Sequence, residues 1–272
     1  AFMKLKAPLV IRMNGSDAYF CQLENRPQKK KNFFFEKKAL KAADHLLSVS
    51  EYTAGETTRI FGLKKEIQVI PNSVDVENFS PNGTEIEPFS ILYFGSIIRK
   101  KGVLELGEIF NRVVRYCPEA TLYIAGNDVI DQQSFLSTRA LVMDEFSPEA
   151  SKKVKWLGML PYNKIQQQIA KALVVVLPSF AEALPIAWLE AMAMQKALVT
   201  SNIGWAEEVM IDGETGFTVH PTDHSAYAAR ILELLKEEEL ALEMGRKARA
   251  QVQEKFSAEV VANMNLEFYR KI

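Results

Sequence analysis

Short apolar runs alternate with amphipathic stretches along this chain of 272 residues, and that alternation restricts its fold more than any other feature. Runs such as Phe89–Phe94, Ala172–Leu177 and Ala197–Thr200 have the length and composition of buried strands, and turn residues end them. Helical patterns fill most of the sequence between such runs. Strands and helices in this order are typical of a doubly wound, mainly parallel sheet. The sequence therefore predicts an α/β fold.

One polar stretch, residues 76–88 with the sequence VENFSPNGTEIEP, interrupts this pattern. Its proline, glycine and asparagine residues are typical of a linker between domains. A second series of strands and helices begins after it. We therefore predict two α/β halves that face a cleft, with domains at residues 1–80 and 89–255, a linker at 81–88 and a closing helix at 256–272.

Composition argues against several classes of protein. The net charge of -1 provides no basic field for nucleic-acid binding, so we expect no nucleic-acid partner. Cys21 and Cys117 form no CxxC or metal-binding pattern, which favours a reducing compartment over a disulfide scaffold. No apolar run is long enough to span a bilayer, and no signal peptide stands at Ala1. We expect a soluble, cytoplasmic protein.

Residues 26–41, RPQKKKNFFFEKKALK, combine many lysines with three consecutive phenylalanines. A polybasic, aromatic helix can lie on an anionic bilayer, which would place the chain at the inner face of the membrane. Residues 33–40 also fit an amphipathic helix whose phenylalanines pack on a sheet while its lysines stay in water. We favour the second interpretation, and peripheral membrane contact stays open.

Two loops that follow predicted strands are candidate ligand sites, because α/β sheets bind ligands at the carboxyl ends of their strands. Asn14 and Gly15 follow the predicted strand Pro8–Met13, and they fit a simple turn equally well. Between Gly95 and Gly102, three cations precede a helix. That arrangement suits an anion, although a run of surface lysines is the alternative.

A third loop follows the predicted strand Ala172–Leu177 and carries Glu182. Pro185 opens the next helix, whose N-terminus suits a phosphate, and Glu190 lies within that helix. Such carboxylates could bind sugar hydroxyls or stabilise positive charge on an anomeric carbon. Glu190 could instead be a solvated helix residue, but its apolar neighbours make an unpaired charge there costly. The loop therefore predicts a site for a phosphate ester beside a carboxylate.

Other common catalytic patterns are missing. The sequence has no GxSxG elbow, no Walker A lysine and no GxGxxG after a strand. His45, His220 and His224 are scattered, without metal-ligand spacing to carboxylates or cysteines.

The segment from Glu182 to Ala193 resembles the E-x7-E signature of group 1 (family 4) retaining glycosyltransferases, which have the GT-B fold. Further segments match this family in order and spacing: Ser48–Ser50, Val69–Asp75 with Phe79, Gly95–Gly102 and Gly204–Gly216. The resemblance runs from about Pro8 to the closing helix. The opening part of the family's N-terminal domain, with its glycine-rich loop, is missing from this sequence. The resemblance thus implies two Rossmann-like domains, the N-terminal one incomplete.

The resemblance implies a retaining hexosyltransferase. Its C-terminal half would bind a UDP- or GDP-type sugar donor, its N-terminal half would hold a saccharide or lipid-linked acceptor, and the closing helix would pack back on the N-terminal domain. The catalytic positions would be Glu182, near the donor sugar, and Asn14; Glu190 would bind the ribose, and Lys101 would neutralise the diphosphate. No metal or other cofactor is implied. The remaining implied donor-binding residues are Ser96, Arg99, Gly158, Leu160, Ala183, Leu184, Pro185 and Ile186.

Several positions depart from the family pattern. Ser96 replaces the arginine of the G-R-x4-K-G motif, so Arg99 or Lys100 would have to substitute for it. Gln195 replaces a usual glycine, and Asn14 replaces the histidine of the catalytic loop. Two alternatives to sugar transfer stay open: a sugar-nucleotide epimerase of the same fold, and, because acceptor-side elements are missing from this sequence, a fragment that binds a nucleotide sugar without turnover.

Overall fold

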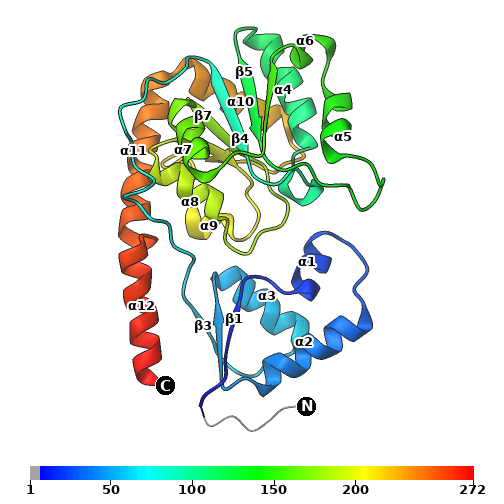
Figure 1. Ribbon diagram of the computed structural model, residues 1–272, viewed down its shortest axis with the longest axis vertical. Helices are drawn as coiled ribbons and strands as arrows, with labels where there is room; N and C mark the ends of the chain where they lie inside the picture. Colours follow the sequence, from blue (N-terminus) through cyan, green and yellow to red (C-terminus); the bar gives the residue numbers. More distant parts are fainter. Residues whose placement is uncertain (1–6) are drawn as a thin grey trace.

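The computed structural model describes residues 7–272 and contains two separate sheets, one in each of two stacked lobes (Figure 1). Ala1 and the rest of the first six residues of the predicted 1–80 domain lie outside the described part. The smaller sheet has the order β1-β2-β3, with all pairs parallel. Its strands are β1 (Val10–Met13), β2 (His45–Ser48) and β3 (Ile67–Val69).

The larger sheet has the order β6-β5-β4-β7-β8-β9, and every strand pair in it is parallel. This order places β4 and β7 side by side at its centre, as in a doubly wound fold. Its strands are β4 (Ser90–Phe94), β5 (Thr121–Ala125), β6 (Val154–Gly158), β7 (Val174–Leu177), β8 (Ala197–Thr200) and β9 (Phe217–Thr218).

Helices follow most of the strands and cover the sheets. Those of the smaller lobe are α1 (Asp17–Leu23), α2 (Lys30–Ala42) and α3 (Glu51–Phe61). The larger lobe contains the 3-10 turn η1 (Arg99–Lys101) and the helices α4 (Glu105–Tyr116), α5 (Thr138–Glu145), α6 (Pro148–Ser151), α7 (Tyr162–Lys171), α8 (Ile186–Ala193), α9 (Ala206–Val209), α10 (His224–Lys236) and α11 (Glu238–Lys255). The last helix is α12 (Ala258–Lys271).

Local sequence explains where several helices begin. The side chains of Ser16, Ser50 and Ser257 each accept a hydrogen bond from a backbone amide in the first turn of α1, α3 and α12. Asp223 caps α10 in the same way. These side chains satisfy amides that a helix leaves without internal partners.

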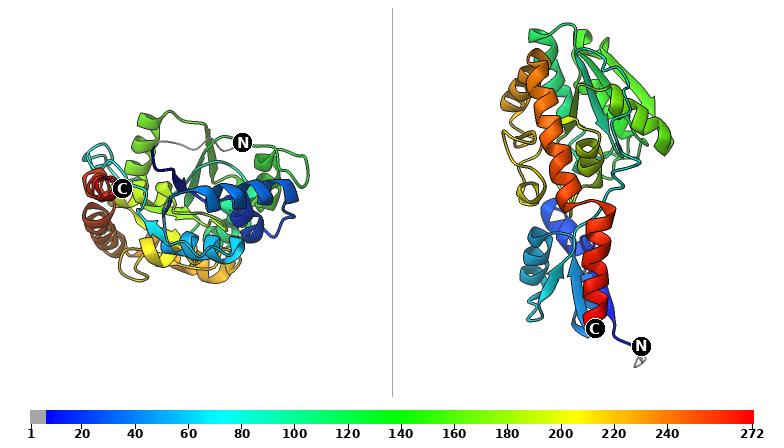
Figure 2. Two further views of the ribbon diagram at one scale, coloured as in Figure 1. Left: turned by 90° about the horizontal axis from the view of Figure 1, so that it is seen from below. Right: turned by 90° about the vertical axis from the view of Figure 1, so that its left-hand side faces the viewer.

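The last helix returns to the smaller lobe. Figure 2 shows α11 and α12 following one side of the molecule, so that α12 lies along the smaller sheet. Val261 and Phe268 of α12 form an apolar cluster with Leu47 and Ile70, which lie on or just after the strands of that sheet. The helix therefore buries one face of the smaller sheet.

The structure refines the prediction for α2. The helix extends beyond the predicted residues 33–40, and only Phe33 of the three phenylalanines packs inward, where it stacks on Phe61 at 5.0 Å. Phe34 and Phe35 remain 60% and 54% exposed. The helix face that points away from the lobe is therefore both aromatic and basic.

Some elements lie where no sequence pattern predicts them. Helix α1 follows the Asn14 turn, and α5 and α6 occupy the stretch between β5 and β6. Both cysteines are free and buried. Within residues 7–272, no helix combines the length and the apolar composition needed to cross a bilayer.

Candidate functional site

The predicted site centres on the loop between β7 and α8, at the carboxyl edge of the larger sheet. We call residues 178–185 the donor loop, after the sugar-donor role that the family resemblance implies for it. It lies where the larger lobe meets the smaller one, because Tyr19 of α1 donates a hydrogen bond to the Glu182 carbonyl at 2.5 Å. The carboxyl ends of strands from both sheets thus meet at this loop (Figure 1).

Glu182 forms a short ion pair with Lys101. Its Oε1 atom lies 2.5 Å from Nζ of Lys101 and accepts a hydrogen bond from Ser179 Oγ at 2.9 Å. The two charged side chains are 12% and 26% exposed. This environment strengthens their attraction relative to water while leaving both open to a ligand. The structure therefore brings together the carboxylate and the lysine that were predicted separately.

The loop that carries Lys101 packs tightly on the donor loop. The carbonyl of Lys100 accepts hydrogen bonds from the amides of Phe180 and Ala181 at 2.8 and 3.3 Å. Gly102 has a φ angle of +68°, and a Cβ atom there would lie 1.8 Å from the carbonyl oxygen of Pro178. A glycine is therefore required at residue 102, both for its backbone conformation and for this close approach.

The other cations of this loop have protein partners. Arg99 donates two hydrogen bonds to the Asp131 carboxylate, at 2.7 and 3.1 Å, and these hold the pKa of Asp131 well below its usual value. The Lys100 ammonium lies 4.2 Å from the centre of the Phe20 ring. Ser96 is exposed, and its carbonyl accepts a hydrogen bond from Tyr93. Neither Arg99 nor Lys100 is oriented by Glu182, unlike Lys101.

Glu190 lies on α8 and is only 8% exposed. Burial raises the pKa of its carboxyl, and a 2.8 Å hydrogen bond from the Tyr162 hydroxyl opposes part of that rise. The sequence argument that a glutamate among these apolar neighbours needs a partner is thus confirmed. The partner is a tyrosine at the start of α7, which the sequence analysis did not single out.

The remaining predicted positions lie in neighbouring loops. Gly158 ends β6 with a φ angle of +67° and is exposed, whereas Leu160 is half-buried against the main core. Pro185 precedes the first turn of α8, and Ile186 is 48% exposed. Asn14 is exposed in the turn between β1 and α1.

Family models decide which family this chain belongs to. One described as "Glycosyl transferases group 1" matches residues 75–251, and one described as "Glycosyltransferase Family 4" matches residues 1–78. The chain belongs to the group 1 glycosyl transferases. The recognition made from the E-x7-E segment and the other ordered matches is therefore confirmed.

Similar proteins show which glycosyltransferases this chain resembles and how much of their length it covers. It is 30% identical to an alpha-maltose-1-phosphate synthase of Mycolicibacterium smegmatis, over 87% of this chain and 65% of that protein. It is 25% identical to the capsular polysaccharide biosynthesis glycosyltransferase CapM of Staphylococcus aureus, over 84% of this chain and 62% of that protein. The chain therefore spans less than two thirds of either relative.

A solved structure confirms the predicted GT-B fold. HepE from Anabaena, crystallised with UDP and glucose, superposes with a TM-score of 0.83 at 18% identity, covering 97% of this chain and 72% of HepE. The parallel sheets of both lobes are part of this likeness.

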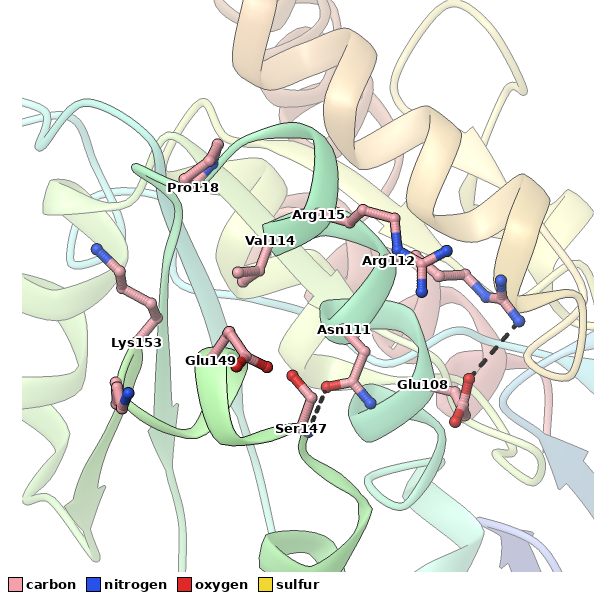
Figure 3. A pocket seen from close by; sticks show the side chains of 10 residues that line it. Glu108, Asn111, Arg112, Val114, Arg115, Pro118, Ser147, Glu149 and Lys153 are labelled. Carbon is pink, nitrogen blue, oxygen red and sulfur yellow. Dashed lines mark hydrogen bonds and ion pairs between the residues drawn. The ribbon is translucent and has the colours of Figure 1, made fainter.

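A surface groove of about 630 Å³ lies elsewhere on the larger lobe of this glycosyltransferase, between α4 and α6 (Figure 3). Arg112, Arg115 and Glu149 are among its lining residues, and none of the predicted site residues is. The groove is therefore separate from the donor loop.

The residues described by the structure offer no cluster of three or more histidine, cysteine, aspartate or glutamate side chains that could hold a metal ion. Lys101 is the cation that contacts the donor loop through a side chain.

Proposed function

We propose that this chain binds a nucleotide-diphosphate sugar of the UDP or GDP type and transfers its hexose, with retention, to a polysaccharide or lipid-linked acceptor. The observation that carries this proposal is the juxtaposition of the Lys101–Glu182 pair with the donor loop. The ion pair fixes the positions of both side chains near the N-terminus of α8, where a phosphate would bind. Without its partner, the Glu182 side chain would be free to turn toward solvent.

The two glutamates have separable roles in this proposal. Glu182 faces the sugar and the diphosphate, together with Lys101. Glu190 accepts hydrogen bonds from the ribose hydroxyls. In the structure the same carboxylate accepts a hydrogen bond from the Tyr162 hydroxyl. A bound donor would thus extend along α8, with its nucleoside near Glu190 and its sugar near Glu182.

Similar proteins support this choice of ligands. HepE binds UDP and glucose in its crystal structure, which favours a UDP-type donor at the corresponding fold position. CapM is named for capsular polysaccharide biosynthesis, and a relative from Corynebacterium glutamicum is named for mannosyl transfer to a phosphatidylinositol mannoside. These names motivate saccharide and lipid-linked acceptors for the assay.

Nucleotide binding is the first test. Thermal shifts with UDP, GDP and ADP identify the base, and radiolabelled nucleotide sugars with candidate acceptors then test transfer. Transfer with an unchanged anomeric configuration supports the proposal. Sugar binding without transfer or release supports the binding-only alternative, and an epimerised nucleotide sugar supports the epimerase.

Glu182→Gln separates catalysis from nucleotide binding. We expect turnover to fall by at least about 100-fold, because the variant loses the charge opposite Lys101, while the affinity for free nucleotide changes little. Glu207→Gln, on the solvent side of α9, is the control. Full transfer activity in Glu182→Gln would rule out the catalytic role.

We also propose that α2 contacts an anionic bilayer. Its outward face carries Lys31, Phe34, Phe35 and Lys41, while Glu36, the acidic residue of this helix, turns inward and accepts hydrogen bonds from the start of α1. Exposed aromatic rings among lysines suit an anionic interface, where each lysine contributes about 1 kcal/mol.

Vesicle sedimentation tests this contact. The chain should pellet with phosphatidylserine vesicles and stay in solution with phosphatidylcholine alone, and the double substitution Phe34→Ser with Phe35→Ser should reduce pelleting about tenfold. Leu266→Ser with Tyr269→Ser, on the exposed side of α12, is the matched control. Equal pelleting by both double variants would refute a specific role of α2.

A further inference from the structure

The donor loop presents three consecutive carbonyls to the smaller lobe. Each accepts a hydrogen bond from a different element there: Tyr19 to Glu182 at 2.5 Å, Ser50 to Ala183 at 2.7 Å and Asn72 to Leu184 at 3.0 Å. The donors belong to α1, to the start of α3 and to the turn after β3. The backbone of the donor loop is thus held from the other lobe.

This contact determines where the loop amides point. In a trans peptide, the C=O and N–H groups point in opposite directions. Because the carbonyls of Glu182 and Ala183 face the smaller lobe, the amides of Ala183 and Leu184 face away from it. Neither amide donates to an acceptor among residues 7–272, although the two residues are only 7% and 5% exposed. These amides have no acceptor within the described protein and are therefore available to an acceptor from a ligand.

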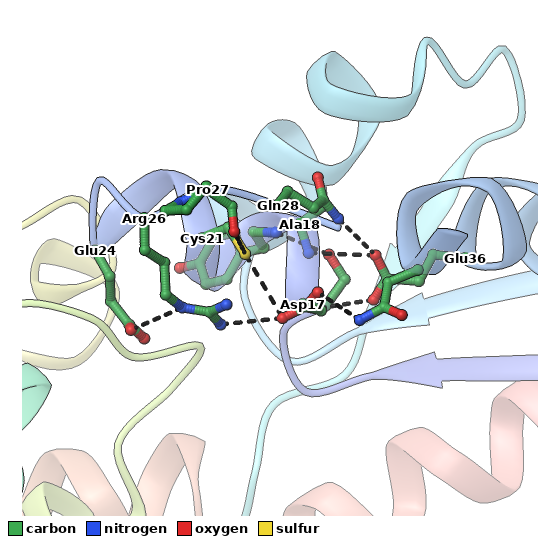
Figure 4. Close-up of polar contacts among 11 residues, drawn as sticks. Asp17, Ala18, Cys21, Glu24, Arg26, Pro27, Gln28 and Glu36 are labelled. Atoms are coloured by element: carbon green, nitrogen blue, oxygen red, sulfur yellow. Dashed lines mark hydrogen bonds and ion pairs between the residues drawn. The ribbon is translucent and has the colours of Figure 1, made fainter. Parts of the chain in front are cut away.

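Tyr19, the first of these three hydrogen-bond donors, lies on a helix that is fixed by polar contacts. Figure 4 shows the polar network around the start of α1. The Asp17 carboxylate accepts hydrogen bonds from Asn32 at 3.1 Å and from Arg26 at 3.0 Å, and these hold its pKa below the usual value. Glu36 of α2 accepts the Asp17 amide at 2.7 Å. Helix α1 is therefore fixed to α2 and keeps Tyr19 in place.

A second contact docks the same lobe. The Glu208 carboxylate of α9 accepts hydrogen bonds from the amides of Glu51 and Tyr52 at 2.7 and 2.8 Å, at the N-terminus of α3. The Tyr52 ring lies so close to Gly204 that a Cβ atom there would be 2.0 Å from it. These amides report directly on whether the two lobes are docked.

We propose that Tyr19, Ser50 and Asn72 are positioning residues, through which docking of the smaller lobe turns the Ala183 and Leu184 amides toward the donor diphosphate. The inference rests on the proposed donor site and adds that contacts from the smaller lobe set the orientation of its amides. Affinity for the phosphate end of the donor then depends on residues that do not touch it. The nucleoside end, at Glu190, has no such dependence.

Calorimetry with UDP and UMP, or with GDP and GMP if the base is guanine, tests this split. Tyr19→Phe and Asn72→Leu each remove one hydrogen-bond donor with little change of size and without adding a charge. We expect each to weaken diphosphate binding about tenfold relative to the wild-type chain, while monophosphate affinity changes by less than about twofold. Unchanged diphosphate affinity, or equal losses for both nucleotides, would overturn the proposal.

Tyr227→Phe is the matched control. Its hydroxyl donates to the Val199 carbonyl at 2.5 Å, another buried tyrosine–carbonyl bond, but one that lies wholly within the larger lobe. We expect this variant to lose stability without changing the ratio of diphosphate to monophosphate affinity. A changed ratio in Tyr227→Phe would show that general loosening, and not the loop contact, controls the site.

Amide hydrogen exchange in the ligand-free chain separates this inference from the proposed function. In Tyr19→Phe and Asn72→Leu, the Glu51 and Tyr52 amides should exchange several-fold faster, and in Tyr227→Phe they should not. If the wild-type chain binds no nucleotide, the proposed function and its ligand fail, whatever the exchange result. If nucleotides bind but exchange at these amides is unchanged, the positioning role alone fails.

Discussion

The two sheets of this protein are both parallel, yet their strands are buried to different degrees. Every residue of the inner strands β4, β7 and β8 of the larger sheet is buried, whereas the inner strand β2 of the smaller sheet is buried at three of its four residues. The outer strands of both sheets are more exposed: Met13 is the buried residue of β1, and neither β3 nor β6 has one. The larger sheet has helices packed on both faces and supplies most of the core. The smaller sheet depends on α12 for one face. The larger lobe thus holds its own structure, while the smaller one relies on contacts from distant parts of the chain.

Polar contacts reinforce the smaller lobe where apolar burial is thin. Arg12 of β1 donates to the carbonyls of Ile70 and Pro71 and to Asn265 of α12, each at 3.0 Å. Hydrogen bonds to a charged donor are stronger than average, but each needs its partner in place. The comparison predicts that substitutions in the packed loops of the larger lobe reduce the stability of that lobe. Substitutions in the smaller lobe are expected to weaken its contacts with the rest of the chain.

The largest effect is expected for Gly102→Ala, which tests the rigidity of the larger lobe. The new Cβ atom would meet the Pro178 carbonyl, and the left-handed backbone adds strain, so we expect a loss of more than about 3 kcal/mol in unfolding free energy. Gly213→Ala is the control, because its φ is +76° with nothing within 4 Å. It should cost only about 1 kcal/mol. Equal losses in urea unfolding would contradict the packing argument.

Lys101→Met should reduce diphosphate affinity about 100-fold, because it removes the cation beside the donor loop and leaves Glu182 unpaired. Lys100→Met is the matched control, since that ammonium contacts the Phe20 ring instead. Calorimetry with UDP or GDP measures both. A larger loss of diphosphate affinity in Lys100→Met than in Lys101→Met would show that Lys100, and not Lys101, contacts the phosphates.

Phe33→Ala tests the thinner core of the smaller lobe. Because this ring stacks on Phe61, we expect a loss of about 2 kcal/mol in stability, whereas Phe35→Ala, on the exposed side of the same helix, should change it by less than about 0.5 kcal/mol. Thermal unfolding monitored by circular dichroism compares them. Equal shifts would place both rings in the same environment, contrary to the structure.

The smallest effect is a pH dependence at the nucleoside end. The ionised Glu190 carboxylate accepts ribose hydroxyls, so nucleotide affinity should fall as pH decreases through the raised pKa of Glu190. Tyr162→Phe removes the hydrogen bond that lowers this pKa, so the decline should begin at a higher pH. Glu190→Gln should bind about tenfold more weakly and show no such decline. A midpoint that is unchanged in Tyr162→Phe would contradict this assignment.

The sign for stability follows from the same shift. A carboxyl whose pKa is raised on folding favours the folded state in its protonated form and opposes it when ionised. Glu190 therefore lowers stability above its folded pKa. Glu190→Gln should be as stable as the wild type, or more stable, at neutral pH, even though it binds nucleotide more weakly.

Sequence patterns predicted much of the larger lobe because its strands are continuous apolar runs. Residues 89–94, 172–177 and 197–200 lie in β4, β7 and β8 or next to them, as predicted. Residues 17–23 and 138–151 gave no comparable pattern. Helix α1 is short and depends on the Asp17 network, and α5 and α6 pack on α4 through few apolar positions. Short helices stabilised by tertiary contacts leave little periodicity to detect.

The sequence by itself determined the α/β class and the family, and it singled out Glu182, Lys101 and Glu190 as candidate site residues. Their pairing was decided only by the tertiary structure, which joins Lys101 to Glu182 and Tyr162 to Glu190. The hydrogen bonds from the smaller lobe to the donor loop were likewise visible only in the tertiary structure. Hydrogen-bond partners far apart in sequence depend on the packing of whole domains, and no local periodicity encodes them.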